Sequence, residues 1–146
     1  MVTDTRPKAQ VFSLKTPLLS AGRTNKTVAG TDLLKVRIKV YAEGGENGLH
    51  AHFDEDHSFV ILQGQATFHD ESENTTVVNK HEGIMLPRGA YYYFQSTGNE
   101  NLVLLRVGAG RKPEGGYRLG THGRPLSNEE NKNVPGVPIP GEDFGD

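Results

Sequence analysis

Short β-rich runs separated by turn residues recur along this chain at intervals of about ten residues. In the clearest run, residues 34–40, apolar side chains alternate with lysines and an arginine. This period of two predicts a strand with one face on a core and the other face in water. The remaining predicted strands are 10–14, 58–62, 65–68, 75–78, 83–86, 91–95 and 102–107. The pattern favours an antiparallel all-β sandwich or barrel.

Three of the six histidines lie close together, at His50, His52 and His57. In extended backbone the side chains of residues i and i+2 point to the same face, so His50 and His52 can converge on one metal ion. Neutral imidazole is a common metal ligand. The alternative is a pair of surface histidines on a loop before a strand. We expect metal binding.

Glycines at fixed distances make the histidine pattern more specific. Gly44 is followed by five residues, His50-x-His52, four residues, His57, six residues and Gly64. This spacing resembles the first motif of the cupin family, with His57 at the position where most cupins have glutamate.

A second segment, residues 83–92, resembles the second cupin motif. Its Pro-x-Gly turn is intact, Gly83 is two residues nearer to the proline than usual, and Tyr92 stands where the family usually places its last histidine. The resemblance covers roughly residues 32–108. It implies an all-β, single-domain cupin, that is, a double-stranded β-helix or jelly-roll barrel.

The resemblance also implies that His57 is the third metal ligand. The alternative is that His57 contacts substrate or another ligand, while Asp54, Glu55 or Asp56 supplies a carboxylate. Asp56 would face the opposite side of the strand from His57. The predicted metal ligands are therefore His50, His52 and His57.

Tyr92 is predicted to be catalytic, as a hydrogen-bond donor. A phenol with a pKa of about 10 is a poor ligand at neutral pH, so direct coordination would require the metal to stabilise the phenolate. A purely packing role is the third alternative. Tyr91 and Tyr93 would face the opposite side and are predicted to pack a core layer or an interface.

Several other side chains receive structural predictions. Arg88 and Arg106 could clamp a substrate carboxylate, but a surface ion pair is predicted for each. His69, His81 and His122 are predicted to be solvated or turn residues. The residues predicted to line the barrel are Phe53, Phe59, Phe68 and Phe94.

The charge of the ligands determines the expected chemistry. Three neutral imidazoles leave a divalent ion its full charge, whereas a glutamate ligand would reduce it, so the site should favour anionic, bidentate oxygen ligands. The arrangement resembles three-histidine iron cupins that cleave diketones with dioxygen, and equally zinc cupins that bind polyketide-like molecules. We expect one divalent ion, Fe²⁺ or Zn²⁺ first and Mn²⁺, Ni²⁺ or Cu²⁺ as further options.

The expected function is a dioxygenase acting on a small oxygen-rich molecule. Two alternatives stay open. One is an isomerase or polyketide-type cyclase that uses the metal only as a Lewis acid, and the other is a non-catalytic binding module.

Composition narrows the class of protein and its partners. The chain has 146 residues, a formal net charge of −2 and no cysteine, which favours one domain and excludes disulfides and thiolate metal sites. Without a basic cluster we expect no nucleic-acid or membrane partner, and the polar N-terminus favours the cytoplasm.

The two ends of the chain differ from the middle. Residues 1–31 are predicted to form one strand and a wrapping arm, residues 32–108 the barrel, and residues 109–146 a Pro/Gly-rich tail. Proline removes backbone donors, so the tail should not form a regular ladder and should pack on the barrel or on a partner subunit. A homodimer is expected.

Overall fold

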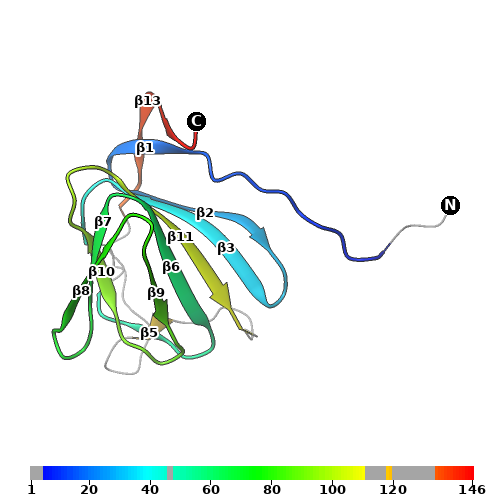
Figure 1. Cartoon of the computed structure of the whole chain (residues 1–146), viewed down its shortest axis with the longest axis horizontal. Helices are drawn as coiled ribbons and strands as arrows, with labels where there is room; N and C mark the ends of the chain where they lie inside the picture. Colours follow the sequence, from blue (N-terminus) through cyan, green and yellow to red (C-terminus); the bar gives the residue numbers. More distant parts are fainter. Residues whose placement is uncertain (1–4, 46–47, 111–117, 120–133) are drawn as a thin grey trace.

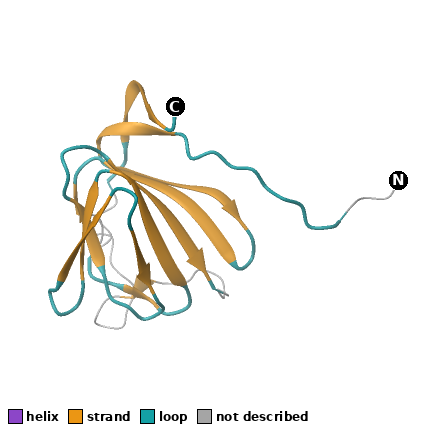
Figure 2. Ribbon diagram, viewed as in Figure 1, coloured by secondary structure: helices purple, strands orange, loops and turns teal. Residues whose placement is uncertain are grey.

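The computed structural model describes residues 5–45, 48–110, 118–119 and 134–146, and its regular elements are all strands (Figures 1 and 2). The all-β prediction is therefore confirmed. None of the described segments is a helix long and apolar enough to span a membrane.

Two antiparallel sheets face each other and enclose the main core. The five strands of the larger sheet are, in spatial order, β2 (Arg23–Gly30), β3 (Leu34–Tyr41), β11 (Leu102–Ala109), β6 (Asp56–Gln63) and β9 (Gly83–Leu86). The four strands of the smaller sheet are β4 (Gly44–Gly45), β10 (Tyr93–Ser96), β7 (Gln65–His69) and β8 (Thr75–Asn79). A tight turn joins β6 to β7 at Gly64, whose φ of 81° suits glycine.

Two short strand pairs complete the structure. β5 (Ala51–His52) pairs with β12 (Arg118–Leu119), and β1 (Thr16–Ala21) pairs with β13 (Val137–Phe144). The β1–β13 ladder shifts register twice. The proline-containing end of the chain thus lies against a strand of the same chain, through an irregular ladder.

The prediction of a strand at residues 10–14 is wrong. The first strand begins at Thr16, which is the first residue with a ladder partner, Phe144. Residues before it have strand-like composition, but propensity alone does not make a strand without a neighbouring strand to accept its hydrogen bonds. The segment runs outward from the sheets toward the N-terminus (Figure 1).

The core is divided between two faces of the larger sheet. The inner cluster lies between the sheets and includes Phe59, Phe68, Phe94 and Leu104. The outer cluster is formed by Leu19 of β1 packed against Ile38, Val40 and Val103. The larger sheet therefore buries both of its faces.

This double burial corrects the prediction for residues 34–40. Ile38 and Val40 face the outer cluster beneath β1, while Lys39 and Tyr41 are buried on the inner face. Leu34, predicted on the core side, is exposed. The face predicted to be in water lines the barrel, where Lys39 lies over the rings of Tyr41 and Phe94 and Arg37 lies opposite Arg106.

Candidate metal centre

The histidine segment lies at one end of the barrel and is tied there by backbone hydrogen bonds. His50 precedes β5 and forms an antiparallel bridge with Tyr92. The Tyr92 N–H donates to the His50 carbonyl at 2.8 Å, and the His50 N–H donates to the Tyr92 carbonyl at 3.1 Å. The predicted strand 91–95 begins two residues later, at Tyr93, because Tyr92 is engaged in this isolated bridge. The bridge joins the two motif segments recognised in the sequence.

His52, Glu55 and His57 form a buried cluster of metal-ligand type. One ring nitrogen of each histidine and one carboxylate oxygen lie within 4.8 Å of one another. The three residues are 7%, 2% and 1% exposed. Two atoms bound to one ion at about 2.1 Å lie up to about 4 Å apart, so small side-chain rotations would bring all three onto an ion. Two imidazoles and one carboxylate are also the donor set of many non-haem iron sites.

The sequence offers Glu55 only as an alternative source of a carboxylate and does not predict its position next to His57. The relevant signal is the i, i+2 spacing of Glu55 and His57, the same spacing that placed His50 and His52 together. A glycine on the neighbouring strand makes room for the pair. A Cβ on Gly108 would lie 3.1 Å from both Glu55 Oε1 and His57 Cδ2.

His50 lies beside this cluster without being part of it. Its ring centroid is 5.1 Å from that of His52 and 4.5 Å from that of Tyr92. The His50 Nδ1–H donates to the Gly48 carbonyl at 2.7 Å, which leaves the lone pair of the neutral ring on Nε2. A hydrogen bond of this kind orients metal-binding histidines in other proteins.

The Nε2 atom of His57 is contacted by two groups of opposite charge. It forms a short contact with Glu55 Oε1, and Arg106 Nη2 lies 2.8 Å from it. A ring nitrogen has either one proton or one lone pair, so it cannot donate to the carboxylate and accept from the guanidinium at once. A cation held jointly by Nε2 and Oε1 would satisfy both acceptors, and the donor set therefore fits a metal ion.

Tyr92 lies within the site and not on the surface. Its hydroxyl is 3.4 Å from His52 Nε2, and its ring packs on Phe59 and Phe68 at the top of the inner core. Tyr91 and Tyr93 are half-buried on the other side of the chain. The tyrosine hydroxyl is thus within reach of a ligand atom of the cluster.

Arg88 forms a surface ion pair and Arg106 does not. Arg88 Nε lies 3.3 Å from Asp56 Oδ1 and both side chains are exposed, as predicted. Arg106 is buried and lies 3.4 Å from Glu55 Oε1, so the surface ion pair predicted for it is wrong. The reason is the alternation of side chains along β11. Leu102 and Leu104 face the inner core, so Arg106 and Gly108, at the next two alternate positions, face the same side.

A second arginine lies near the first. Arg37 of β3 is directly opposite Arg106 in the ladder. Burial lowers the pKa of Arg37, repulsion from Arg106 lowers it further, and attraction by Glu55 partly opposes both. The guanidinium charges of both arginines therefore interact with the carboxylate in the ligand cluster.

A cavity of about 310 Å³ lies between the smaller sheet and β9, and its lining includes Tyr92 of the candidate site. Its wall is formed by Phe68, Ile84, Leu86 and Tyr92, with the acidic turn residues Asp70 and Glu71 among its remaining residues. Leu86 is the ladder partner of His57. The cavity therefore adjoins two residues, Tyr92 and Leu86, that are themselves neighbours of the ligand cluster.

The remaining sequence predictions have mixed outcomes. Phe59, Phe68 and Phe94 line the barrel, but Phe53 is 52% exposed and contacts Tyr91, because it follows β5 in a surface turn. His81 is an exposed turn residue, whereas His69 is half-buried and stacks on Tyr93. His122 lies outside the described residues.

Comparison with known proteins points to one family. Residues 37–108 match the family model described as the cupin domain. A protein with a double-stranded β-helix domain from Klebsiella pneumoniae has 17% identity and a TM-score of 0.62, over 72% of this chain and 93% of that chain. No curated protein matches significantly.

Two other solved structures agree in fold. A conserved protein of unknown function from Streptococcus pyogenes has 23% identity and a TM-score of 0.57, over 77% of this chain and 95% of that chain. A cupin superfamily protein from Desulfitobacterium hafniense has 17% identity and a TM-score of 0.52, over 60% of this chain and 76% of that chain. At these identities the likeness concerns the fold.

Proposed function

Because the chain belongs to the cupin superfamily, we propose that it binds one divalent metal ion and acts on a small oxygen-rich molecule as a dioxygenase-type enzyme. The observation that carries the proposal is the convergence of His52, Glu55 and His57 in a buried cluster. Ionisable groups buried together at the end of a barrel, beside a cavity, are typical of a site that binds a metal and a small molecule.

We propose that His52 and His57 are the central ligands, with Glu55 and His50 completing the set. The tautomer of His50 supports its inclusion, because the hydrogen bond to Gly48 leaves Nε2 able to bind a cation. A bound ion would supply Lewis acidity and, if it is iron, the electrons for activating dioxygen. A carboxylate ligand would lower the effective charge of the ion below that expected from three histidines alone.

The chain's own residues would position the substrate and its protons. The Tyr92 hydroxyl, near His52, would donate a hydrogen bond to an oxygen atom of the bound substrate. Tyr92 is itself buried, which strengthens such a hydrogen bond.

The test is metal analysis of protein purified without a histidine tag. We expect about one metal per chain, and no retained metal in the single variants His52→Ala and His57→Ala. Glu55→Gln and His50→Ala should each weaken binding by about tenfold or more, the range for removing supporting groups at metal sites. His69→Ala is the matched control, because that histidine lies outside the cluster. Full metal occupancy in His52→Ala or His57→Ala would refute the assignment.

The identity of the metal separates two kinds of chemistry. A redox-active ion such as Fe²⁺ should support dioxygen consumption in the presence of substrate, measured with an oxygen electrode. A zinc-loaded protein that consumes no oxygen would instead support the isomerase or cyclase alternative.

One contact favours a second candidate, a binding module without metal. Arg106 donates to the same Nε2 atom of His57 that a metal would use. If protein equilibrated with Fe²⁺ and with Zn²⁺ retains neither ion, this candidate replaces the enzyme.

A further inference from the structure

The inner surface of the barrel next to the ligand cluster carries basic side chains. Along β3 the inward positions include Arg37 and Lys39, and along β11 they include Arg106. The ladder places Arg106 between Arg37 on one side and Phe59 on the other. Phe59 is two residues beyond His57 on the same face of β6. The arginines and the ligand cluster therefore share one face of the larger sheet.

Buried positive charge exceeds buried negative charge in this region. Glu55 is the only acidic residue among the buried described residues, whereas Lys39 and Arg106 are both 9% exposed or less. Arg37 adds a third, half-buried cation directly opposite Arg106. Like charges opposite each other in a ladder are destabilising, and buried charge is costly unless it is compensated.

Glu55 cannot balance these cations and also hold a metal ion. Its Oε1 atom already contacts both His57 and Arg106. If a metal occupies Nε2 of His57, the guanidinium of Arg106 must give up its hydrogen bond to that nitrogen. The charge on the metal would then add to the positive charge already present, so the site would attract a further anion.

We propose that the small molecule bound in this barrel carries a carboxylate, and that Arg106 and Arg37 bind it. The inference rests on the proposed function for the location of the site, and it names the chemical class of the ligand. Guanidinium groups match a planar carboxylate with two parallel hydrogen bonds, which a lysine cannot do.

The remainder of the ligand would be small, with an apolar part near Ile84, Leu86 and Tyr92. The cavity beside the cluster measures about 310 Å³, and its wall near the cluster is formed by Ile84, Leu86 and Tyr92. A ligand with its acid group at Arg106 would have to extend across β6 to place an aryl or alkyl body in this cavity, whose lining also includes His69, Asp70 and Glu71. Specificity would come from the charged group, because a site built for an ionic contact rejects a neutral analogue strongly.

The test compares acids with their neutral amides, using the full-length chain. The probes are phenylacetate with phenylacetamide and hexanoate with hexanamide, titrated against chelator-treated protein by NMR. Removing the metal matters, since a bound ion would itself attract a carboxylate. Failure of the metal site and failure of the carboxylate site are thereby distinguished: metal analysis tests the first and these titrations test the second.

We expect at least one acid to bind about ten- to a hundredfold more tightly than its amide, the effect of one or two charged hydrogen bonds. Arg37→Gln and Arg106→Gln should each remove most of that preference. Arg88→Gln is the matched control, because Arg88 is an exposed arginine paired with Asp56, and it should leave the preference unchanged.

The carboxylate site is overturned if neither acid binds more tightly than its amide. It is also overturned if Arg37→Gln and Arg106→Gln both retain the full preference in protein whose melting temperature matches the wild type. A preference that Arg88→Gln removes would show that the acids bind to the surface and not in the barrel.

Discussion

Nη2 of Arg106 on β11 lies 2.8 Å from Nε2 of His57 on the adjacent strand β6. A permanently charged guanidinium thus lies against the nitrogen atom that the proposed metal would need. The contact gives Arg106 an effect on metal binding that can be measured without knowing the substrate.

Arg106→Gln should therefore bind a divalent ion more tightly than the wild type. The change removes both a competitor for Nε2 and a positive charge a few ångströms away, and we expect a gain of about tenfold or more. Competition with a chromogenic chelator would measure the affinity, with Arg88→Gln as the control for loss of an exposed arginine. Weaker binding in Arg106→Gln would mean that the guanidinium supports the ligands instead of opposing the ion.

Gly108 is predicted to be essential for the ligand geometry although it is no ligand itself. An added Cβ would lie 3.1 Å from Glu55 Oε1 and from His57 Cδ2, closer than most real contacts. We expect Gly108→Ala to fold with little change in melting temperature and to bind metal at least about tenfold more weakly, as when a supporting group is disturbed. Unchanged affinity in a folded Gly108→Ala would show that Glu55 and His57 shift without loss of binding.

Tyr92→Phe separates the three roles weighed for this tyrosine. If the Tyr92 hydroxyl is a hydrogen-bond donor, the variant should keep the metal content and melting temperature of the wild type, while turnover falls by roughly 10- to 1000-fold. If Tyr92 is a metal ligand, the variant should bind metal more weakly, and its oxidised iron form should lack any phenolate-to-ferric absorption band. If the variant matches the wild type in metal binding and turnover, Tyr92 only packs.

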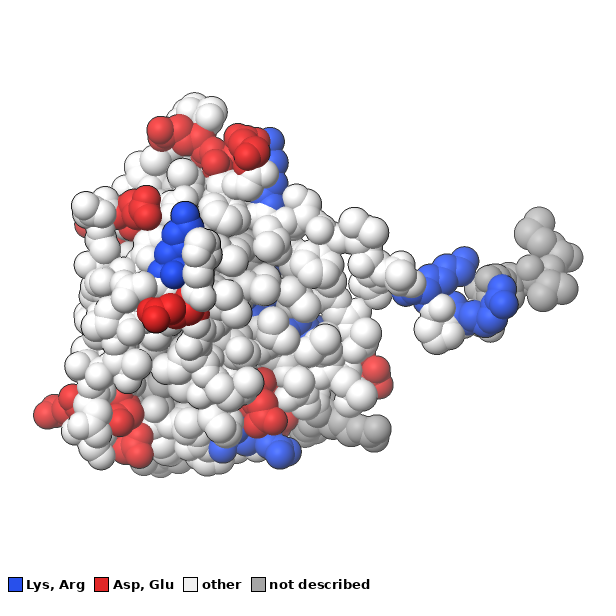
Figure 3. Space-filling view, in the orientation of Figure 1, with Lys and Arg blue, Asp and Glu red and all other residues white. Residues whose placement is uncertain are grey.

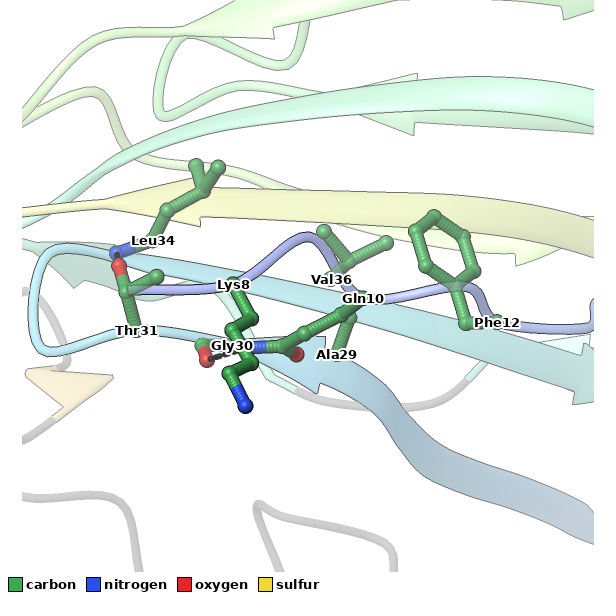
Figure 4. A pocket seen from close by; sticks show the side chains of 8 residues that line it. All are labelled: Lys8, Gln10, Phe12, Ala29, Gly30, Thr31, Leu34 and Val36. Carbon is green, nitrogen blue, oxygen red and sulfur yellow. Dashed lines mark hydrogen bonds between the residues drawn. The ribbon is translucent and has the colours of Figure 1, made fainter. Parts of the chain in front are cut away.

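We propose that the chain forms a homodimer through its N-terminal arm, residues 5–15. As the arm leaves the sheets, Lys8, Gln10 and Phe12 line an open groove of about 260 Å³ together with residues of β2 and β3 (Figure 4). Val11 of the arm is fully exposed, and Phe12 is 44% exposed and lines the groove together with Leu34, which is also exposed. An apolar patch of this kind typically contacts another protein surface.

Val11→Asp combined with Phe12→Asp should convert the proposed dimer to a monomer in analytical ultracentrifugation, because both changes would bury charge at the interface. Val77→Asp, at an exposed apolar position on β8, is the matched control and should leave the mass unchanged. A wild-type monomer, or a double variant that remains dimeric, would contradict the proposal.

Figure 3 shows acidic and basic side chains in small separate groups on the visible face, and basic residues on the arm.

Local sequence pattern was sufficient for the fold class and for several elements. The run 83–86 matches β9 in full, and Gly64 is the turn between β6 and β7. Alternation along extended backbone also placed His50 beside His52, with ring centroids 5.1 Å apart, while His57 was added by the family resemblance. These features depend on contacts close in the chain.

The tertiary structure decided which face of β3 is the interior. The sequence shows only that apolar and basic residues alternate, and the usual assumption puts the basic ones in water. Here β1 covers Ile38 and Val40, so Arg37 and Lys39 face the barrel instead. The sequence near β3 does not show that β1 covers the face with Ile38 and Val40. That cover involves β1, which is itself paired with β13 at the other end of the chain.

The position of Arg106 was decided in the same way. Its alternation within β11 is readable from the sequence, but its contact with Glu55 and His57 requires the register of β11 against β6, which joins residues 49 positions apart. Register is set by the packing of whole sheet faces, and a shift of one residue would reverse every side chain. The sequence by itself therefore determined an all-β chain with a histidine motif and a carboxylate two residues from His57, and only the packing of distant strands placed two arginines beside it.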